Sequence, residues 1–207
     1  MDDSSPPPTR KRLSQEQRRA QTRQHFLEAS RTLFARQGFQ GTSLDQVSEL
    51  AGYSRGAFHH AFASKEDLLM ALMQTCFEAD LQTLQALHGA GTASQTNEFR
   101  ARSDHTPVNL EAHLLKLEFW ICALRLPRFG EAYAREFAAY RSALAGLIEV
   151  TAGASPLPAE FTAAVLVALS NGLDTQKLID PAAFPATLYD QVLGQLVTRE
   201  PSPERST

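Results

Sequence analysis

The sequence predicts an all-α protein. Apolar residues recur at the spacing of amphipathic helices along most of the chain, whereas the apolar/polar alternation that marks β-strands is missing. None of the 11 prolines lies between Thr9 and Thr106, so this long stretch is free to be helical. Hydrophobic residues make up 43% of the 207-residue chain, which is enough for the core of one large or two small domains.

Composition divides the chain into four segments. Residues 1–13 are a polar arm that we expect to be disordered, residues 14–65 a three-helix domain, residues 66–200 a larger helical domain, and residues 201–207 a tail. The range from Arg10 to Lys65 holds ten Lys or Arg and four Asp or Glu, and the rest of the chain is acidic. A basic N-terminal third is typical of nucleic-acid binding. The arm itself is either a minor-groove contact or a solvated tail.

The first helix is predicted from Ser14 to Gln37. Ser14 and Gln17 form a capping box at its start, and Gly38 closes it because glycine tolerates the left-handed conformation common after helices. The apolar residues at helical spacing that mark its buried face are Phe26, Ala29, Leu33 and Phe34.

Two short helices joined by a tight turn follow. The first runs from Ser43 to Ala51 and ends at Gly52, which supplies a positive φ. The second runs from Arg55 to Ala61. This arrangement is a helix-turn-helix, whose second helix lies in the DNA major groove, although an ordinary αα-hairpin inside a bundle fits the bare pattern too. Thr42 or Ser43 caps the first of these helices, and Ser54 caps the second. Ala57 and Phe58 lie on the buried face of the second helix.

The outward face of the second short helix indicates a nucleic-acid contact. Arg55, His59 and His60 cannot share the apolar stripe, so we expect them to face solvent or a partner. Arg suits bidentate contact with guanine, and His or Ser reaches phosphates or base edges. Gly56 leaves the helix start open to a phosphate. Two solvated histidines without a role are the alternative.

Four runs of residues between Thr22 and Leu69 resemble the DNA-binding domain of the tetracycline-repressor (TetR) family. The resemblance implies an N-terminal helix-turn-helix domain and a C-terminal helical domain for ligand binding and dimerisation. Two departures are His59, where the family has a Tyr that contacts phosphate, and Tyr53, where an aliphatic residue is usual. The four runs are Gly38-Phe39, Gly41-Thr42-Ser43-Leu44, Ala51-Gly52-Tyr53-Ser54-Arg55-Gly56-Ala57-Phe58 and Phe62-Ala63-Ser64-Lys65-Glu66-Asp67-Leu68-Leu69.

The resemblance and the outward face together set the expected DNA contacts. In the family the start of the second helix contacts phosphate, a role that falls here to Thr42 and Ser43. Lys65, at the start of the fourth helix, is expected to point toward the DNA. The expected DNA-binding residues are Thr42, Ser43, Tyr53, Ser54, Arg55, Gly56, His59, His60 and Lys65.

The remaining helices are predicted from caps and breaks. Ser64 caps a long fourth helix, and His88 to Thr106 is a polar loop. Pro107, capped by Thr106, opens a helix that Pro127 ends. Three further helices are predicted at Phe129 to Val150, Ala159 to Leu178 and Ala183 to Thr198. The last two are expected to hold a homodimer through Ala163, Ala164, Val167, Ala168, Asn171, Gly172, Leu188, Val192 and Leu196.

Three short runs in the C-terminal part, Leu117 to Trp120, Leu169 to Leu173 and Leu178 to Pro181, resemble betaine-type repressors of the same family. The resemblance implies an apolar effector cavity with a few polar groups, which we expect among the fourth to seventh helices. Plain core packing explains each candidate equally well. The expected ligand-binding residues are Phe77, Leu81, His113, Leu117, Trp120, Phe137 and Tyr140.

The resulting expectation is a ligand-responsive transcriptional regulator, a repressor that binds a pseudo-palindromic DNA operator as a homodimer. The sequence has no Gly-rich phosphate loop, no zinc-spaced Cys or His pair and no Gly-x-Ser-x-Gly motif, so we expect no enzyme activity, cofactor or metal. Two cysteines, no signal-peptide core and no long apolar run favour a cytoplasmic protein without membrane association. The alternative is a helical small-molecule-binding protein that acts through a protein partner without operator reading.

Overall fold

The computed structural model describes residues 14–89, 108–151 and 157–184, and these residues form α-helices without a β-strand. None of the described helices is long and apolar enough to cross a membrane. The all-α prediction is therefore confirmed for this part of the chain. The helices are α1 (Gln15–Gly41), α2 (Leu44–Ala51), α3 (Arg55–Ala61), α4 (Lys65–Gly89), α6 (Leu110–Arg125), α7 (Pro127–Thr151) and α8 (Ala159–Ile179).

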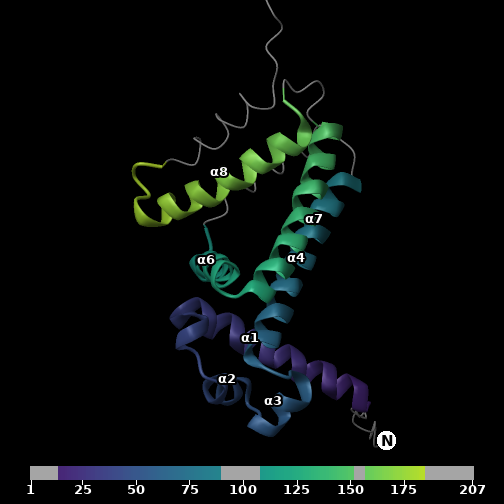
Figure 1. The fold of residues 1–207 in the computed structure, drawn as a ribbon, viewed down its shortest axis with the longest axis vertical. Helices are drawn as coiled ribbons and strands as arrows, with labels where there is room; N and C mark the ends of the chain where they lie inside the picture. Colours follow the sequence, from purple (N-terminus) through teal and green to yellow (C-terminus); the bar gives the residue numbers. More distant parts are fainter. Residues whose placement is uncertain (1–13, 90–107, 152–156, 185–207) are drawn as a thin grey trace, which may run out of the picture.

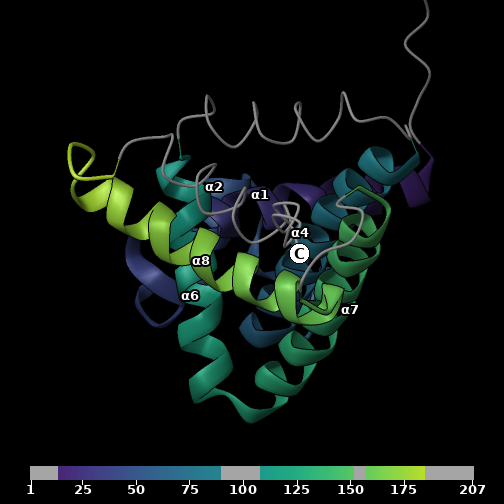
Figure 2. The same cartoon turned by 90° about the horizontal axis from the view of Figure 1, so that it is seen from above.

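The helices form an elongated assembly with α2 and α3 at one end (Figure 1). Helix α1 lies across these two short helices, and α4 and α7 run side by side away from them. Helix α6 packs against α1, and α8 crosses the far end over α6 and α7 (Figure 2). Thus α1, α4 and α6 connect the short helices to the rest of the molecule.

The described residues form two apolar core clusters. The larger one joins α1, α2 and α3 to α4, α6 and the start of α7, so the short helices share their core with the rest of the chain. The smaller one lies between the ends of α4 and α7 and the helix α8. The largest fully buried apolar side chains are Phe26, Phe34, Phe58, Leu68, Leu69, Leu72, Met73 and Leu115. Burial of such side chains is the main source of stability.

The ends of α1 follow the sequence prediction. Ser14 and Gln17 form the predicted capping box. Gly38 has φ 76° and ψ 163°, so the regular helix stops there and one more turn continues to Gly41. Thr42, the residue after this turn, donates its N–H to the carbonyl of Phe39 at 3.3 Å.

The ends of α6 and α7 correct the prediction. Asn109 caps α6 by accepting the N–H of Ala112 at 3.1 Å, so the helix does not start at Pro107. Asparagine is a favoured N-cap residue because its side-chain oxygen reaches the free N–H groups of the first turn. Pro127 opens α7, two residues before the predicted start. Proline lacks a backbone N–H, and the first helical position does not use one in the helical hydrogen bonds.

Several predictions fall on residues outside the described ranges. They concern the arm 1–13, the loop beyond Gly89, most of the helix predicted at Ala183 to Thr198, and the tail.

The predicted dimer face on α8 is partly wrong. Ala163, Val167 and Asn171 are buried within the single chain, where the smaller core cluster forms between α7 and α8. Ala164 and Ala168 are exposed, and a Cβ added at Gly172 would meet open space. The outward face of α8 is therefore narrower than the sequence pattern indicated.

Candidate nucleic-acid interface

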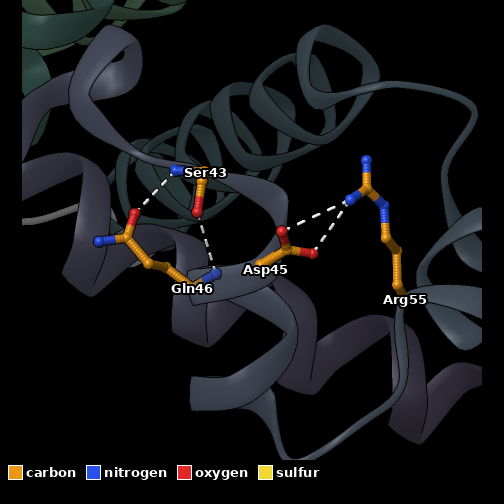
Figure 3. A network of polar contacts seen from close by, with 4 residues as sticks. All are labelled: Ser43, Asp45, Gln46 and Arg55. Atoms are coloured by element: carbon orange, nitrogen blue, oxygen red, sulfur yellow. Dashed lines mark hydrogen bonds and ion pairs between the residues drawn. The ribbon is translucent and has the colours of Figure 1, made fainter.

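The turn between α2 and α3 is built from the residues that the sequence predicted. The hydroxyl of Ser43 accepts the N–H of Gln46 at 3.2 Å, and the Gln46 side chain accepts the N–H of Ser43 at 2.8 Å (Figure 3). Gly52 ends α2 in the left-handed region, with φ 78° and ψ 26°. The hydroxyl of Ser54 then caps α3 by accepting the N–H of Ala57 at 3.2 Å. Both short helices therefore have fixed starting points.

Helix α3 is anchored by one aromatic side chain. Phe58 is fully buried, and its ring meets that of Phe26 on α1 edge to face at a centroid distance of 5.4 Å. Phe62, directly after α3, lies 5.7 Å from the Phe58 ring. Such pairs stabilise packing beyond their buried area. The orientation of α3 on α1 is thus fixed by its buried side.

The opposite side of α3 is polar and exposed. Arg55, Gly56, His59 and His60 are all exposed, as is Ser54 at the cap. The guanidinium of Arg55 forms an ion pair with Asp45 of α2, with 3.2 Å between Nη1 and Oδ1 (Figure 3). Sequence reasoning did not identify Asp45 as the partner of Arg55, because the two residues lie ten positions apart on different helices.

Thr42 and Tyr53 are directed inward, which corrects the expectation that their side chains contact DNA. Thr42 is 2% exposed, and its hydroxyl donates to the carbonyl of Gly38 at 2.8 Å. Tyr53 is half-buried, with its hydroxyl 3.1 Å from Nδ1 of His25 and its ring 5.6 Å from that of Phe26. Both residues hold the helix-turn-helix to α1.

Lys65 also does not point outward as expected. Its ammonium donates to the carbonyls of Phe39 at 2.8 Å and Thr42 at 2.9 Å, and lies 4.3 Å from the centroid of the Phe39 ring. Both carbonyls lie after Gly38, beyond the regular part of α1, where the helical ladder no longer supplies a full set of N–H donors. Burial lowers the pKa of this ammonium from its ordinary value. Lys65 therefore ties the start of α4 to the end of α1.

Glu118 of α6 completes this junction, and sequence reasoning missed its role. Its carboxylate accepts the backbone N–H of Phe39 at 2.7 Å. The available signal was a charged residue inside the otherwise apolar run Leu117 to Trp120. Nearby, Cys122 is a buried free thiol whose pKa is raised to about 12 by burial and by the Glu118 carboxylate.

The expected effector residues divide into two neighbourhoods. In the first, Phe77 of α4 faces three aromatic side chains of α7, with the closest centroid, that of Tyr133, at 5.3 Å. The indole N–H of Trp120 donates to the hydroxyl of Tyr133 at 2.7 Å. Burial raises the pKa of Tyr133 to about 12. We call this group the aromatic cluster, and its members are Phe77, Trp120, Tyr133, Phe137 and Tyr140.

Tyr133 was not among the expected residues. It lies four residues after Phe129 and four before Phe137, and this i, i+4 aromatic spacing was the signal that could have identified it. The rings of Tyr133 and Phe137 stack at 5.6 Å. The expected residues Leu81 and Leu117 are half-buried.

His113 belongs to the second neighbourhood, toward α8. It is 4% exposed, and its Nε2 lies 2.8 Å from the hydroxyl of Thr175. The same hydroxyl lies 2.8 Å from the carbonyl of Asn171, so Thr175 links His113 to the backbone of α8. Burial lowers the pKa of His113, with opposing contributions from Asp174, which raises it, and Lys116, which lowers it.

Comparison with protein families gives two matches. The family described as bacterial regulatory proteins of the tetR family matches residues 26–72, which include α2 and α3. The C-terminal family of BetI-type transcriptional repressors matches residues 99–201. Together the two matches cover both ends of the described structure.

Curated relatives match only near the N-terminus. The transcriptional repressor AcnR of Corynebacterium glutamicum is 43% identical over 51 residues, which is 25% of this chain and 27% of that protein. The transcriptional regulator AcrR of Shigella flexneri is 39% identical over 54 residues, 26% of this chain and 25% of its own. The chain thus spans about a quarter of the length of these curated relatives.

Solved structures share the fold over nearly the whole chain. A transcriptional regulator of Pseudomonas aeruginosa PAO1 has a TM-score of 0.72 and 24% identity, covering 90% of this chain and 91% of that one. A regulator of Saccharomonospora viridis, solved with choline, has a TM-score of 0.71 and 22% identity, covering 87% and 100%. These structures show a shared fold. The two family matches, on a chain with this helix-turn-helix geometry, identify it as a member of the tetR family of bacterial regulatory proteins.

Proposed function

We propose that this chain is a ligand-responsive transcriptional repressor that acts in the cytoplasm, with residues 14–65 as its DNA-binding domain. The observation that carries the proposal is the exposed polar face of α3, opposite the fully buried Phe58. A helix presented in this way fits the major groove. The excess of Lys and Arg from Arg10 to Lys65 supports attraction to phosphates.

The proposed DNA contacts are of two kinds. Arg55 reads a base edge, because the guanidinium pairs bidentately with guanine. The phosphate and supporting contacts come from exposed residues of the helix-turn-helix. Thr42, Tyr53 and Lys65 act from inside by holding the ends of the helices. The proposed supporting residues are Ser43, Ser54, Gly56, His59 and His60.

Selection of bound sequences from a random pool of double-stranded DNA tests this function. We expect enrichment of a pseudo-palindrome whose half-sites lie about 34–36 Å apart, the separation that a two-fold dimer imposes. Binding should weaken steeply with salt. If no sequence is enriched, the chain is instead a ligand-binding protein that acts through a protein partner.

We propose that the outward face of α8 contributes the homodimer interface. Phe161 is 55% exposed there, and the small Ala164 and Ala168 permit close helix approach. A two-fold interface uses the same patch of both subunits, so Phe161→Glu places two negative charges in it. We expect monomers by light scattering and weak operator binding, whereas a variant that stays dimeric contradicts this interface.

We propose that the effector binds at the aromatic cluster. Faces of aromatic rings attract cations, and the Saccharomonospora viridis regulator of similar fold was solved with choline, so choline is the first compound to test. An effector that fits one conformation better shifts the population and so the affinity for DNA. Binding should alter the emission of Trp120, the single tryptophan of the chain. Release of operator without a change in that emission contradicts this location.

A further inference from the structure

The ion pair between Asp45 and Arg55 joins the two helices of the DNA-facing surface. Asp45 is the second residue of α2, and Arg55 is the first of α3. Nη1 of Arg55 donates to both carboxylate oxygens, at 3.2 Å to Oδ1 and 3.4 Å to Oδ2 (Figure 3). One guanidinium nitrogen therefore meets two acceptors at once, which restricts the direction of the side chain more than one bond does.

Stability does not explain this pair. The Arg55 and Asp45 side chains are 60% and 73% exposed, and exposed ion pairs contribute little to folding. The carboxylate does interact favourably with the N-terminus of α2. That interaction needs an acidic residue in the first turn, but it does not need a bond to Arg55.

The hydrogen bonds of Arg55 within the described residues leave free the donors that base reading requires. A guanidinium has five N–H donors in a planar fork, and the contact with Asp45 uses Nη1 alone. The donors on Nη2 and Nε stay available for the O6 and N7 acceptors of guanine. A long side chain that is already oriented loses less freedom on binding.

We propose that Asp45 is a specificity-determining positioning residue, whose carboxylate orients Arg55 for guanine in the major groove. The inference rests on the proposed function, in which Arg55 reads a base. The same carboxylate repels phosphates, which weakens binding to DNA of any sequence. On unrelated DNA only this repulsion acts, whereas on the operator the orientation of Arg55 opposes it, so Asp45 raises the ratio of operator to unrelated affinity.

This double action gives an expected result for Asp45→Asn in the full-length chain. The variant should bind unrelated DNA more tightly, because a negative charge is removed. Its ratio of operator to unrelated affinity should fall by roughly 2- to 10-fold, the equivalent of fixing one long side chain. Glu49→Gln is the matched control, since it removes the same charge from an exposed position of α2 without touching Arg55.

The experiment measures fluorescence anisotropy with two duplexes of equal length, the sequence enriched by the wild type and a scrambled one. The double variant Asp45→Asn/Arg55→Ala separates orientation from charge. We expect its affinity ratio to equal that of Arg55→Ala, because the carboxylate then has no guanidinium to orient. Thermal unfolding of each variant confirms that it is folded.

Two results overturn the proposal. If Asp45→Asn and Glu49→Gln change both affinities alike, Asp45 acts by charge alone. If Asp45→Asn lowers the ratio equally with and without Arg55, it acts independently of that side chain. Failure of the wild type to enrich any sequence is a different result, since it overturns the proposed function as well.

Discussion

The carboxylate of Glu118 on α6 accepts a 2.7 Å hydrogen bond from the backbone N–H of Phe39 at the end of α1. The backbone carbonyl of Phe39 accepts a hydrogen bond from the ammonium of Lys65 on α4 at 2.8 Å. Gly38 precedes it with a positive φ, and a Cβ at Gly38 would lie 3.4 Å from the Glu118 carboxylate. Thus α4 and α6 both hold the segment that leads into α2.

Glu118→Ala should destabilise the protein, because it leaves the N–H of Phe39 without its acceptor. We expect a loss of about 1–3 kcal/mol in the free energy of unfolding, measured with urea. Glu118→Gln keeps a side-chain oxygen in place and serves as the control with a smaller loss. Equal stability of the alanine variant and the wild type would show that the N–H finds another partner.

Lys65→Ala should also lower stability, by about 1.5–3 kcal/mol, because two carbonyls lose a charged donor. Arg55→Ala is the contrasting variant: its exposed side chain should leave the unfolding curve unchanged, yet operator affinity should fall by about 1–3 kcal/mol. The two readouts are urea unfolding and the salt dependence of DNA binding. If the Lys65→Ala protein keeps wild-type stability and its salt slope drops by about one unit, Lys65 contacts a DNA phosphate, as the sequence predicted.

His113 should make stability depend on pH. Burial holds its pKa below the unfolded value of about 6.5, so between these two values the unfolded chain binds more protons. The contribution of neutral His113 is therefore fully present above about pH 6.5 and is lost as the pH falls from the unfolded value through the lower folded pKa. Urea unfolding from pH 8 to 5 measures this loss.

The matched variants for this pH effect are His113→Gln and His59→Gln. The first should flatten the decrease in stability at low pH, whereas the second, on the exposed face of α3, should leave it unchanged. Identical pH profiles for His113→Gln and the wild type would assign the acid sensitivity to other groups.

Tyr133→Phe should shift the emission of Trp120, because the indole N–H loses the acceptor that lies 2.7 Å away. An unpaired buried donor costs about 1–3 kcal/mol, so the melting temperature should fall too. Tyr140→Phe removes a hydroxyl from the same aromatic cluster and is the control for emission. If both variants show wild-type emission, the bond to Tyr133 does not persist in solution.

Short-range signals predicted most of the helix-turn-helix. Ser43, Gly52 and Ser54 act through neighbours one turn away, so their roles as caps and break follow from the local sequence. The apolar spacing around Phe58 likewise fixed which side of α3 is buried. These features need no knowledge of the rest of the fold.

Contacts between distant segments could not be predicted in the same way. Lys65 was expected to face DNA, yet its partners are carbonyls more than twenty residues earlier in the chain. Glu118 and Phe39 are 79 residues apart, and nothing local to either residue indicates the other. The burial of Ala163 and Val167 depends on which face of α8 meets α7, which small side chains do not reveal.

The shared core has a consequence for exchanging parts between regulators. The core cluster that holds Phe26 and Phe58 also includes Phe119 and Phe129. The helix-turn-helix therefore shares its core with α6 and α7 and cannot be exchanged as an independent unit. A chimera that joins the N-terminal region of a relative to this chain must also match the partner of Glu118 and the contacts of α1 with α6. Compatible crossover points therefore follow the α1/α6 contact surface and not the sequence boundary before α4.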